Sequence, residues 1–371
     1  MHAETLSLLH AKRPDMPIFI PSFKTRSTLR PLASMGFTNI IPLPFNQIFQ
    51  VNDSPLYLSI LKSGDFRDDS GIYLKFGEFE ALLTVDSSIL NHLILPQNIS
   101  FLATSFAGGA SGHPWCFEHY SIEERKQISA RRLQAVRHSV SQYIQATKPQ
   151  CYVPYAGYFG ELAQRDTFIR TNNVKNNLET IQDLVTQQFP DVRFVNPLDT
   201  DQIVFESKPT QRPQTSCHKN SQPLDTEFVN RYLKQEVSPS QQQLNALILE
   251  YFQHAQFQDS LTLFLQPTSE DFSPNLYGYM INFSQPAGPD IHGPLTPEDL
   301  LSEYETRPTD NRKLLIRVRA AALYDVLRSK KPWEELSIGF QCRIHRTPDV
   351  YNSDFWYHFS NVYIEYTSQV S

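Results

Sequence analysis

The sequence predicts a mixed α/β protein, and three observations support this class. Short β-rich segments bounded by Gly, Pro, Asn or Asp fill the first part of the chain, and a long amphipathic helix follows them. A strand, a helix and a further strand then complete an α/β unit. With 371 residues and 40% apolar content, the chain can bury one large core or two smaller ones.

The first predicted elements are a helix over residues 5–12 and a strand over residues 16–21. Because no strand precedes that helix, we expect the front of an α/β layer to lie outside this sequence. Residues of high β-propensity then predict a series of strands, two of which should form a hairpin, at 71–76 and 79–85. The other segments of this series are 40–43, 56–61 and 99–104.

Helical signals begin at Ser121, which predicts an N-cap completed by a glutamate three residues later. Apolar residues keep a helical period from there to Lys148-Pro149, so we expect one long amphipathic helix. A strand, a helix and a strand follow, at 151–154, 177–188 and 193–195.

A stretch rich in Pro, Ser, Thr, Gln and Lys indicates a linker beyond the middle of the chain. We therefore expect a first domain over 1–206, a linker over 207–237 and an α+β extension over 238–371. In the extension we expect a helix from 238, strands at 261–265 and 277–283, a helix capped by Thr296, and a long helix with a basic face at 310–329.

Composition excludes several classes of function. A net charge of −6 and the lack of long Lys/Arg runs argue against a nucleic-acid partner. No apolar run approaches the roughly 18 residues that cross a bilayer, and the N-terminus lacks the apolar core of a signal peptide. We expect a cytoplasmic protein with no membrane partner. Four well-separated cysteines without a CxxC pair indicate reduced thiols.

Aspartates near strand ends are the candidate metal ligands. Asp65, Asp68 and Asp69 lie between two predicted strands, and Asp86 ends a third. Carboxylates at strand ends that face one edge often bind hard or borderline metals. Turn chemistry explains Asp65 and Asp68 at least as well, because aspartate is common in β-turns. Asp86, which terminates an apolar strand, has fewer structural reasons to be there.

Two loops that follow predicted strands are candidate binding loops. Phe106 to Gly112 contains three glycines, which allow backbone N–H groups to approach a ligand closely. It matches neither a dinucleotide nor a P-loop spacing, and a glycine-rich turn explains it equally well. Pro154 to Gly160 carries aromatic residues that a core would also use. The histidines show no metal-binding spacing, so the residues alone give no catalytic set.

Three blocks carry a family resemblance. They are Phe106-Ala-Gly-Gly-Ala-Ser-Gly-His-Pro114, Val153-Pro-Tyr-Ala-Gly-Tyr-Phe159 with Thr171-Asn172 and Lys175-Asn176, and Glu335 through Phe359. Together they closely resemble the CMP-N-acetylneuraminate monooxygenase family and its bacterial relatives. The resemblance runs from about residue 5 to about residue 359 and weakens across the predicted linker.

The resemblance implies a partial metallo-β-lactamase-like αββα sandwich with an α+β C-terminal extension. It implies iron or zinc in the full family fold, with a His-x-His-x-Asp-His loop that would lie immediately upstream of Met1. Asp86 falls on the bridging-aspartate position, and we expect Asp65 and Asp69 as further metal ligands. In the family a Rieske domain precedes this part. That cluster needs paired Cys and His residues, which this chain lacks, so a separate Rieske or electron-transfer protein is the expected partner.

The resemblance also implies a ligand, namely a nucleotide-sugar or another phosphorylated small molecule. The residues expected to bind it are Gly108, Gly109, Ser111, Tyr155, Gly157, Tyr158, Asn172, Lys175, Arg343 and Arg346. Two alternatives stay open. The chain could be a non-catalytic truncated remnant or binding module without a metal, or a metal-dependent hydrolase of the same fold.

Overall fold

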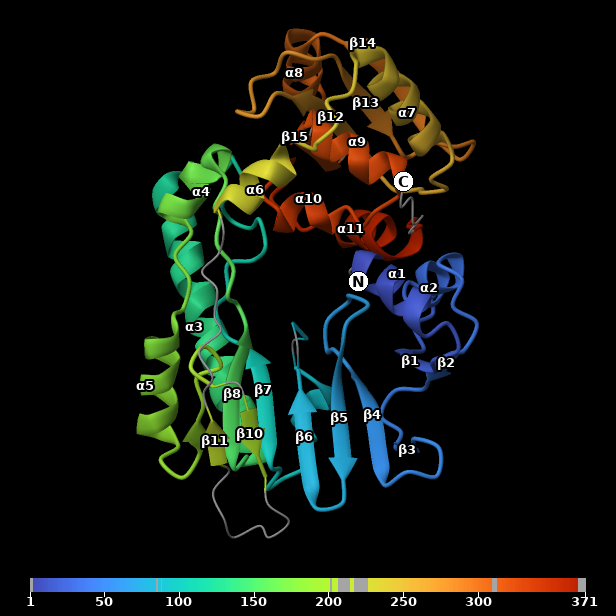
Figure 1. The fold of residues 1–371 in the computed structure, drawn as a ribbon. Helices are drawn as coiled ribbons and strands as arrows, with labels where there is room; N and C mark the ends of the chain where they lie inside the picture. The colour runs from blue at the N-terminus through green and yellow to red at the C-terminus, as the bar shows by residue number, and fades with distance from the viewer. Residues whose placement is uncertain are drawn as a thin grey trace.

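The computed structural model describes residues 3–84, 86–87, 89–200, 202–205, 214–216, 226–308 and 312–365. Its strands form two large sheets, the first from residues before 195 and the second from residues after 260. Figure 1 shows these sheets as a lower and an upper unit. The predicted mixed α/β class is confirmed.

The first sheet has seven strands in the order β3-β4-β5-β6-β7-β8-β9. Strands β3 to β6 form an antiparallel meander, and β6 to β9 run parallel. The predicted hairpin is confirmed as β5 and β6, which are joined by a turn in which Gly77 has a φ of +58°. The strands are β3 (Phe49–Gln50), β4 (Leu56–Lys62), β5 (Ser70–Phe76), β6 (Phe79–Leu83), β7 (Phe101–Ser105), β8 (Cys151–Ala156) and β9 (Arg193–Phe194).

Two helices cover one face of this sheet, namely α3 (Ile122–Thr147) and α5 (Leu178–Gln188) (Figure 1). Helix α3 begins with the predicted capping box, in which Ser121 and Glu124 satisfy each other's backbone N–H groups. The apolar side of its last three turns joins residues of β7 and β8 in one buried cluster. The polar remainder of α3 stays available for other contacts. Helix α4 (Thr167–Asn172) lies between β8 and α5 in sequence.

The second sheet has five strands in the order β14-β13-β12-β15-β16. Strand β12 is buried at every position, as expected for a central strand covered on both faces. The strands are β12 (Leu261–Thr268), β13 (Gly278–Asn282), β14 (Asp290–Leu295), β15 (Arg312–Arg319) and β16 (Cys342–Thr347). The helices of this unit are α7 (Gln241–Gln253), α8 (Pro297–Thr306), α9 (Ala320–Arg328), α10 (Glu334–Ile338) and α11 (Ser353–Tyr357).

The expected long basic helix at 310–329 is wrong. Arg312–Arg319 forms strand β15, and the helix that follows is α9. The apolar run of β15 suits a central strand between β12 and β16, where both faces are buried. Its basic residues are not a solvated face, because Lys313 and Arg319 are both buried and hydrogen-bonded.

Within the predicted linker the structure describes two short elements. Strand β11 (Gln214–Ser216) pairs with β10 (Gln202–Val204), and helix α6 (Thr226–Leu233) follows. The rest of the low-complexity stretch lies outside the described residues, so the domain boundaries stay a prediction. At the other end of the chain, β1 (Ile18–Pro21) pairs in parallel with β2 (Ile40–Leu43), beside α1 (Ala3–Lys12) and α2 (Leu29–Ser34).

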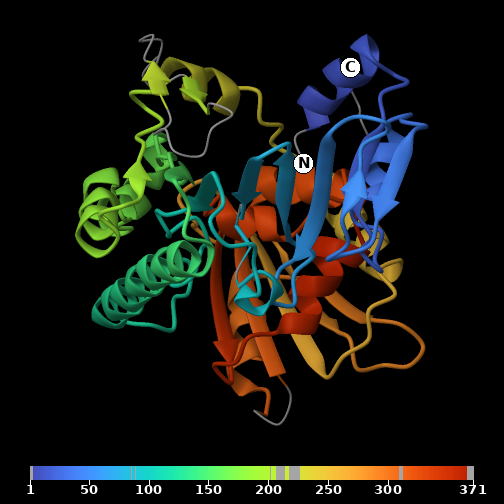
Figure 2. The same ribbon diagram turned by 90° about the horizontal axis from the view of Figure 1, so that it is seen from below.

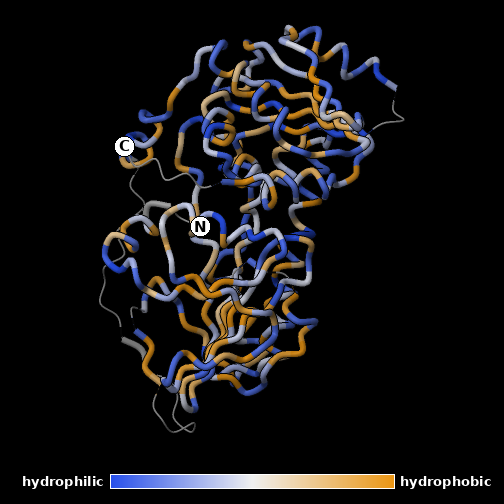
Figure 3. The backbone as a smooth tube through the Cα atoms, turned by 90° about the vertical axis from the view of Figure 1, so that its right-hand side faces the viewer, coloured by the Kyte–Doolittle hydropathy of each residue, from blue (hydrophilic) through white to orange (hydrophobic). Residues whose placement is uncertain are grey.

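Each unit has its own large hydrophobic cluster, and that of the second unit also takes in Trp115, Cys116, Phe117 and Ile169 from the first part of the chain. Figure 2 distinguishes the blue-to-green strands of the first sheet from the orange-to-red strands of the second, and Figure 3 shows hydrophobic segments inside both units. A backbone bridge between Phe117 and Ile344 connects the loop after β7 to β16. None of the described helices combines the length and apolar character needed to cross a bilayer.

Candidate functional site

The three predicted metal ligands, Asp65, Asp69 and Asp86, lie close together in the structure. The group at their centre is the guanidinium of Arg67. The Arg67 guanidinium lies 2.7 Å from an Asp65 carboxylate oxygen and 4.0 Å from one of Asp69. It also donates a hydrogen bond to the backbone carbonyl of Asp86 at 3.2 Å. We call Asp65, Asp69, Asp86 and Glu334, together with Arg67, the acidic cluster.

Burial and nearby negative charges both raise the pKa of two members of this cluster, Asp69 and Glu334. Burial raises the pKa of Asp69, and the charges of Asp86 and Asp65 raise it further. Burial likewise raises the pKa of Glu334, with added repulsion from Asp69, Asp65 and Asp86. The Arg67 guanidinium opposes both shifts. Arg67 therefore acts as the counter-ion of the cluster.

These residues do not fit iron or zinc. Both metals use histidine or cysteine ligands in most protein sites, whereas the cluster offers carboxylates with a guanidinium among them. In the part of the chain that the structure describes, no group of three or more His, Cys, Asp or Glu side chains is arranged to hold a metal ion. We therefore derive no step through a metal.

The predicted glycine loop is built against Lys175 and α3. Gly108 and Gly109 have φ values of +68° and +78°, which favour glycine. The carbonyl of Gly109 accepts a hydrogen bond from Asn173 at 2.8 Å, and Lys175 Nζ pairs with Glu161 at 2.8 Å. The Lys175 charge is therefore already neutralised by a carboxylate.

The second predicted loop is mostly structural. Gly157 has a φ of +138° and lies against Ala107, where a Cβ would come within 2.5 Å of the alanine side chain. The Tyr158 hydroxyl donates to the carbonyl of Pro154, and Tyr155 packs against the apolar cluster beside β8. Asn172 bonds within its own helix, to the carbonyl of Phe168. The described contacts of these residues are internal to the fold.

An open pocket of about 530 Å³ lies beside α3, and we call it the α3 pocket. Its lining side chains come from α3, from the loop after β7 and from the turn after β16. They are His113, Tyr120, Ile128, Arg131, Arg132, Ala135 and Asp349. The four helical residues recur at positions i, i+3, i+4 and i+7, so they share one face of the helix.

Arg132 is the unusual group of the α3 pocket. Its Nη2 donates to Ser111 Oγ at 2.6 Å, and burial lowers its pKa. Among the described residues no carboxylate lies within ion-pair distance of it. His113 is neutral at neutral pH, because burial, Arg132 and Arg346 lower its pKa to about 4. Ser111, which the sequence analysis singled out, thus orients a cation for which the described residues supply no counter-ion.

The other side of the α3 pocket is a fixed hydrogen-bond network. Asp349 accepts from Arg346 Nε at 2.7 Å and from the Tyr120 hydroxyl at 2.7 Å, and its third partner is His119 at 3.1 Å. The Arg346 guanidinium also lies over the Phe117 ring. Arg346 is therefore paired and holds the pocket wall.

Arg343 does not reach the α3 pocket. Its Nη1 donates to the carbonyl of Cys342 at 2.9 Å and lies 3.9 Å from Cys116 Sγ. Two residues named from the sequence, Ser111 and Arg346, thus contact side chains that line the α3 pocket, whereas the sequence analysis did not single out Arg131, Arg132, Tyr120 or Asp349. The available signal was the pair Arg131-Arg132 on the same helical face as Ile128 and Ala135, within the correctly predicted helix.

Curated relatives cover nearly the whole chain. The cytidine monophosphate-N-acetylneuraminic acid hydroxylases of Macaca mulatta and Mus musculus are each 30% identical, over 379 and 380 residues, across 96% of this chain and 60% and 61% of their own length. The Sus scrofa protein of the same name is 28% identical across 96% of this chain and 81% of its own length. The chain thus spans about 60% of the length of the first two relatives.

Solved structures give only weak likenesses. The metallo-beta-lactamase fold protein YhfI from Bacillus subtilis aligns with 52% of this chain and 68% of its own at 11% identity and a TM-score of 0.32. A mutant of CmlA beta-hydroxylase aligns with 54% of this chain and 39% of its own at 14% identity and a TM-score of 0.29. No protein-family model matches. The identity to the curated relatives confirms the resemblance drawn from the sequence, and the chain is a homologue of the cytidine monophosphate-N-acetylneuraminic acid hydroxylases over the part of them that it spans.

Proposed function

We propose that this chain binds a nucleotide-sugar, of the cytidine monophosphate-sialic acid type named in its relatives, in the α3 pocket. The observation that carries the proposal is Arg132, a partly buried guanidinium that is oriented by Ser111 and has no described carboxylate partner. Burying a charge without a counter-ion costs free energy, which an anionic ligand would recover.

The chemistry of the pocket matches such a ligand. A guanidinium presents several N–H donors in a plane, which suits the two oxygens of a carboxylate or phosphate. Arg131 lines the same pocket and adds a second positive charge. Neutral His113 and Tyr120 offer further polar contacts, whereas Lys175 and Arg346 are already paired with carboxylates. We assign anion binding to Arg131 and Arg132.

The proposal concerns binding and not hydroxylation. The acidic cluster does not fit iron or zinc, so the described residues carry no oxygen chemistry that we can assign. Of the alternatives drawn from the sequence, a binding module agrees best with a pocket lined by arginines and with an acidic cluster that an arginine neutralises. Hydroxylation would need metal-binding and electron-transfer groups other than the residues that the structure describes.

Isothermal titration calorimetry tests the proposal directly. The purified chain is titrated with cytidine monophosphate-N-acetylneuraminate, and then with each half of that molecule. We expect saturable binding that falls at least about tenfold, or ~1.4 kcal/mol, in the Arg132→Met variant. The matched control is Lys126→Met, which removes an exposed charge from the same helix outside the pocket. Equal affinity in both variants, or no binding by the unmodified chain, would contradict the proposal.

A further inference from the structure

Two exposed aromatic rings meet where the two units join. Phe66 comes from the turn between β4 and β5 of the first unit, and Tyr351 follows β16 of the second. Their ring centroids lie 5.5 Å apart with an angle of 48° between the ring planes, yet the two residues remain 46% and 50% exposed. We call this pair of rings the aromatic platform. Val350, which precedes Tyr351, is also exposed and adds apolar surface.

Hydrogen bonds within the two turns hold the backbone that carries these rings. Around Phe66, the backbone N–H of Arg67 donates to Asp65 Oδ1 at 3.1 Å, and the two charged side chains form an ion pair at 2.7 Å. In the other turn, the backbone N–H of Val350 donates to the carbonyl of Pro348 at 2.8 Å. Because these turns are already ordered, a ligand that contacts the rings loses little binding free energy to ordering them.

The aromatic platform adjoins the wall of the α3 pocket. Asp349 lines that pocket and is held in place by Arg346 and Tyr120. Tyr351 is two residues further along the chain, so its Cα atom lies within about 7.6 Å of that of Asp349, which is two steps of 3.8 Å. A molecule of the size of a nucleotide can therefore contact the pocket and the platform at the same time.

The exposed ring faces suit a planar base. Every nucleobase has a flat π-face, and bases stack on aromatic side chains without any need for a hydrogen-bond partner. In a nucleotide the ribose separates the base from the phosphate. A ligand whose phosphate lies on Arg131 and Arg132 therefore has a base that is free to contact a second surface, and the platform offers an aromatic one beside the same pocket.

We propose that the aromatic platform is the base-binding part of the ligand site, where the pyrimidine ring of the bound nucleotide stacks on Phe66 and Tyr351. This inference rests on the proposed function, and it adds the position of the base to that of the anion. Because Phe66 belongs to the first unit and Tyr351 to the second, the base-binding part is complete only when the two units are in contact.

Isothermal titration calorimetry of Phe66→Ser and Tyr351→Ser tests this inference. Both side chains are about half exposed, so the variants should fold, and circular dichroism checks this. We expect each variant to bind cytidine monophosphate-N-acetylneuraminate, and cytidine monophosphate alone, about tenfold more weakly than the unmodified chain does. N-acetylneuraminate has no base and should bind the variants as well as it binds the unmodified chain. Tyr351→Phe keeps the ring and should regain most of the affinity lost in Tyr351→Ser.

The matched control is Phe76→Ser, at a phenylalanine that is 55% exposed at the far end of β5 (Figure 1), and its affinity should equal that of the unmodified chain. Unchanged affinity for cytidine monophosphate in both platform variants, or an equal loss for N-acetylneuraminate, would overturn the inference. The proposed function would still stand if Arg132→Met weakened binding, whereas no binding by the unmodified chain would overturn both. Self-association of the unmodified chain that Phe66→Ser abolishes, measured by analytical ultracentrifugation, would assign the platform to contacts between copies instead.

Discussion

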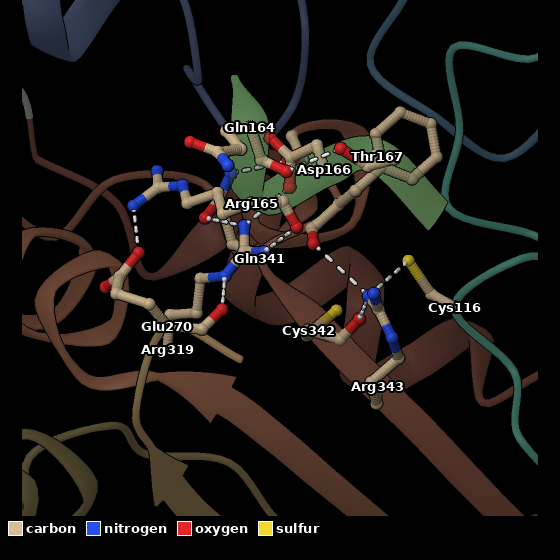
Figure 4. A network of polar contacts seen from close by, with 12 residues as sticks. Cys116, Gln164, Arg165, Asp166, Thr167, Glu270, Arg319, Gln341, Cys342 and Arg343 are labelled. Atoms are coloured by element: carbon tan, nitrogen blue, oxygen red, sulfur yellow. Dashed lines mark hydrogen bonds and ion pairs between the residues drawn. The ribbon is translucent and has the colours of Figure 1, made fainter. Parts of the chain in front are cut away.

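Two arginine-rich regions lie where the units meet, and they differ in what surrounds the guanidinium groups. In one, which we call the junction network, Arg165 pairs with Glu236 and Glu270, and Arg319 pairs with Asp166 (Figure 4). In the other, the α3 pocket, Arg132 has a serine hydroxyl as its only described hydrogen-bond partner. Both regions contain buried or partly buried arginines, but only those of the junction network have carboxylate partners among the described residues.

The difference separates structural from binding arginines. A buried guanidinium that is fully paired within the chain contributes to the fold, because removing it leaves a buried carboxylate alone. A partly buried guanidinium without a counter-ion keeps its capacity for an external anion. The acidic cluster around Arg67 belongs with the junction network on this criterion, although the family resemblance implied metal ligands at three of its aspartates.

The largest effect is expected at Arg319. Its side chain is 1% exposed and bonds to Asp166 at 2.8 Å, to Gln341 at 3.0 Å and to the carbonyl of Glu270 at 2.8 Å. Arg319→Met should lower the free energy of unfolding by about 3–5 kcal/mol, because Asp166 is left without its charge partner. Urea denaturation measures this. Arg307→Met, which breaks an exposed pair with Glu303, is the control and should cost less than about 1 kcal/mol. A similar loss of unfolding free energy in both variants would contradict the structural role given to the buried arginine pairs.

The second effect tests the acidic cluster. Arg67 is about one-third exposed, so we expect Arg67→Met to cost about 2 kcal/mol at pH 7. The pKa values of Asp69 and Glu334 are raised, so the folded chain binds protons more readily than the unfolded chain in mildly acidic solution. Without Arg67 both pKa values should rise further, and the loss should shrink between pH 7 and pH 5. Denaturation at both pH values checks this, with Arg67→Lys as the charge-keeping control; a loss independent of pH would contradict it.

The sequence predicted most elements because their signals are local. The capping box of α3 and the β5-β6 hairpin depend on residues a few positions apart, and both are observed. Strand β15 was missed because its basic residues resemble a solvated helix face until β12 and β16 are known to enclose it. Whether a charge is exposed depends on contacts between residues that are distant in sequence.

For the same reason, the sequence singles out only some of the residues around the α3 pocket. Ser111 and the glycines before it stand out as a motif, whereas Arg132 is one basic residue among several on a polar helix. Its significance depends on which carboxylates come near it, and Asp349, on the far side of the pocket, is already bonded to Arg346 and Tyr120. No spacing rule in the sequence contains that information.

A third, smaller effect concerns His113. Its pKa is lowered to about 4, by burial first, then by Arg132 on α3 and Arg346 on β16, against an opposing effect of Asp349. The unfolded chain therefore binds a proton at His113 below about pH 6.5 that the folded chain does not, so this group lowers stability as the pH falls toward 4. His113→Gln should reduce the loss of stability between pH 7 and pH 5 by about 1 kcal/mol. Denaturation of this variant and of the unmodified chain at the two pH values measures the difference; an unchanged loss would contradict the prediction.

The smallest effect is expected for Arg132→Met, and it bears most directly on the difference between the α3 pocket and the junction network. Arg132→Met keeps the aliphatic stem of the side chain and removes a charge that no described carboxylate balances. We expect the free energy of unfolding to change by less than about 0.5 kcal/mol, because the lost hydrogen bond to Ser111 is offset by relief of the buried charge. Urea denaturation of this variant and of Arg319→Met compares the free energy of unfolding lost in the two regions. A loss of several kcal/mol at Arg132 would mean that this arginine holds the fold together, and the α3 pocket would then lose the property that distinguishes it from the junction network.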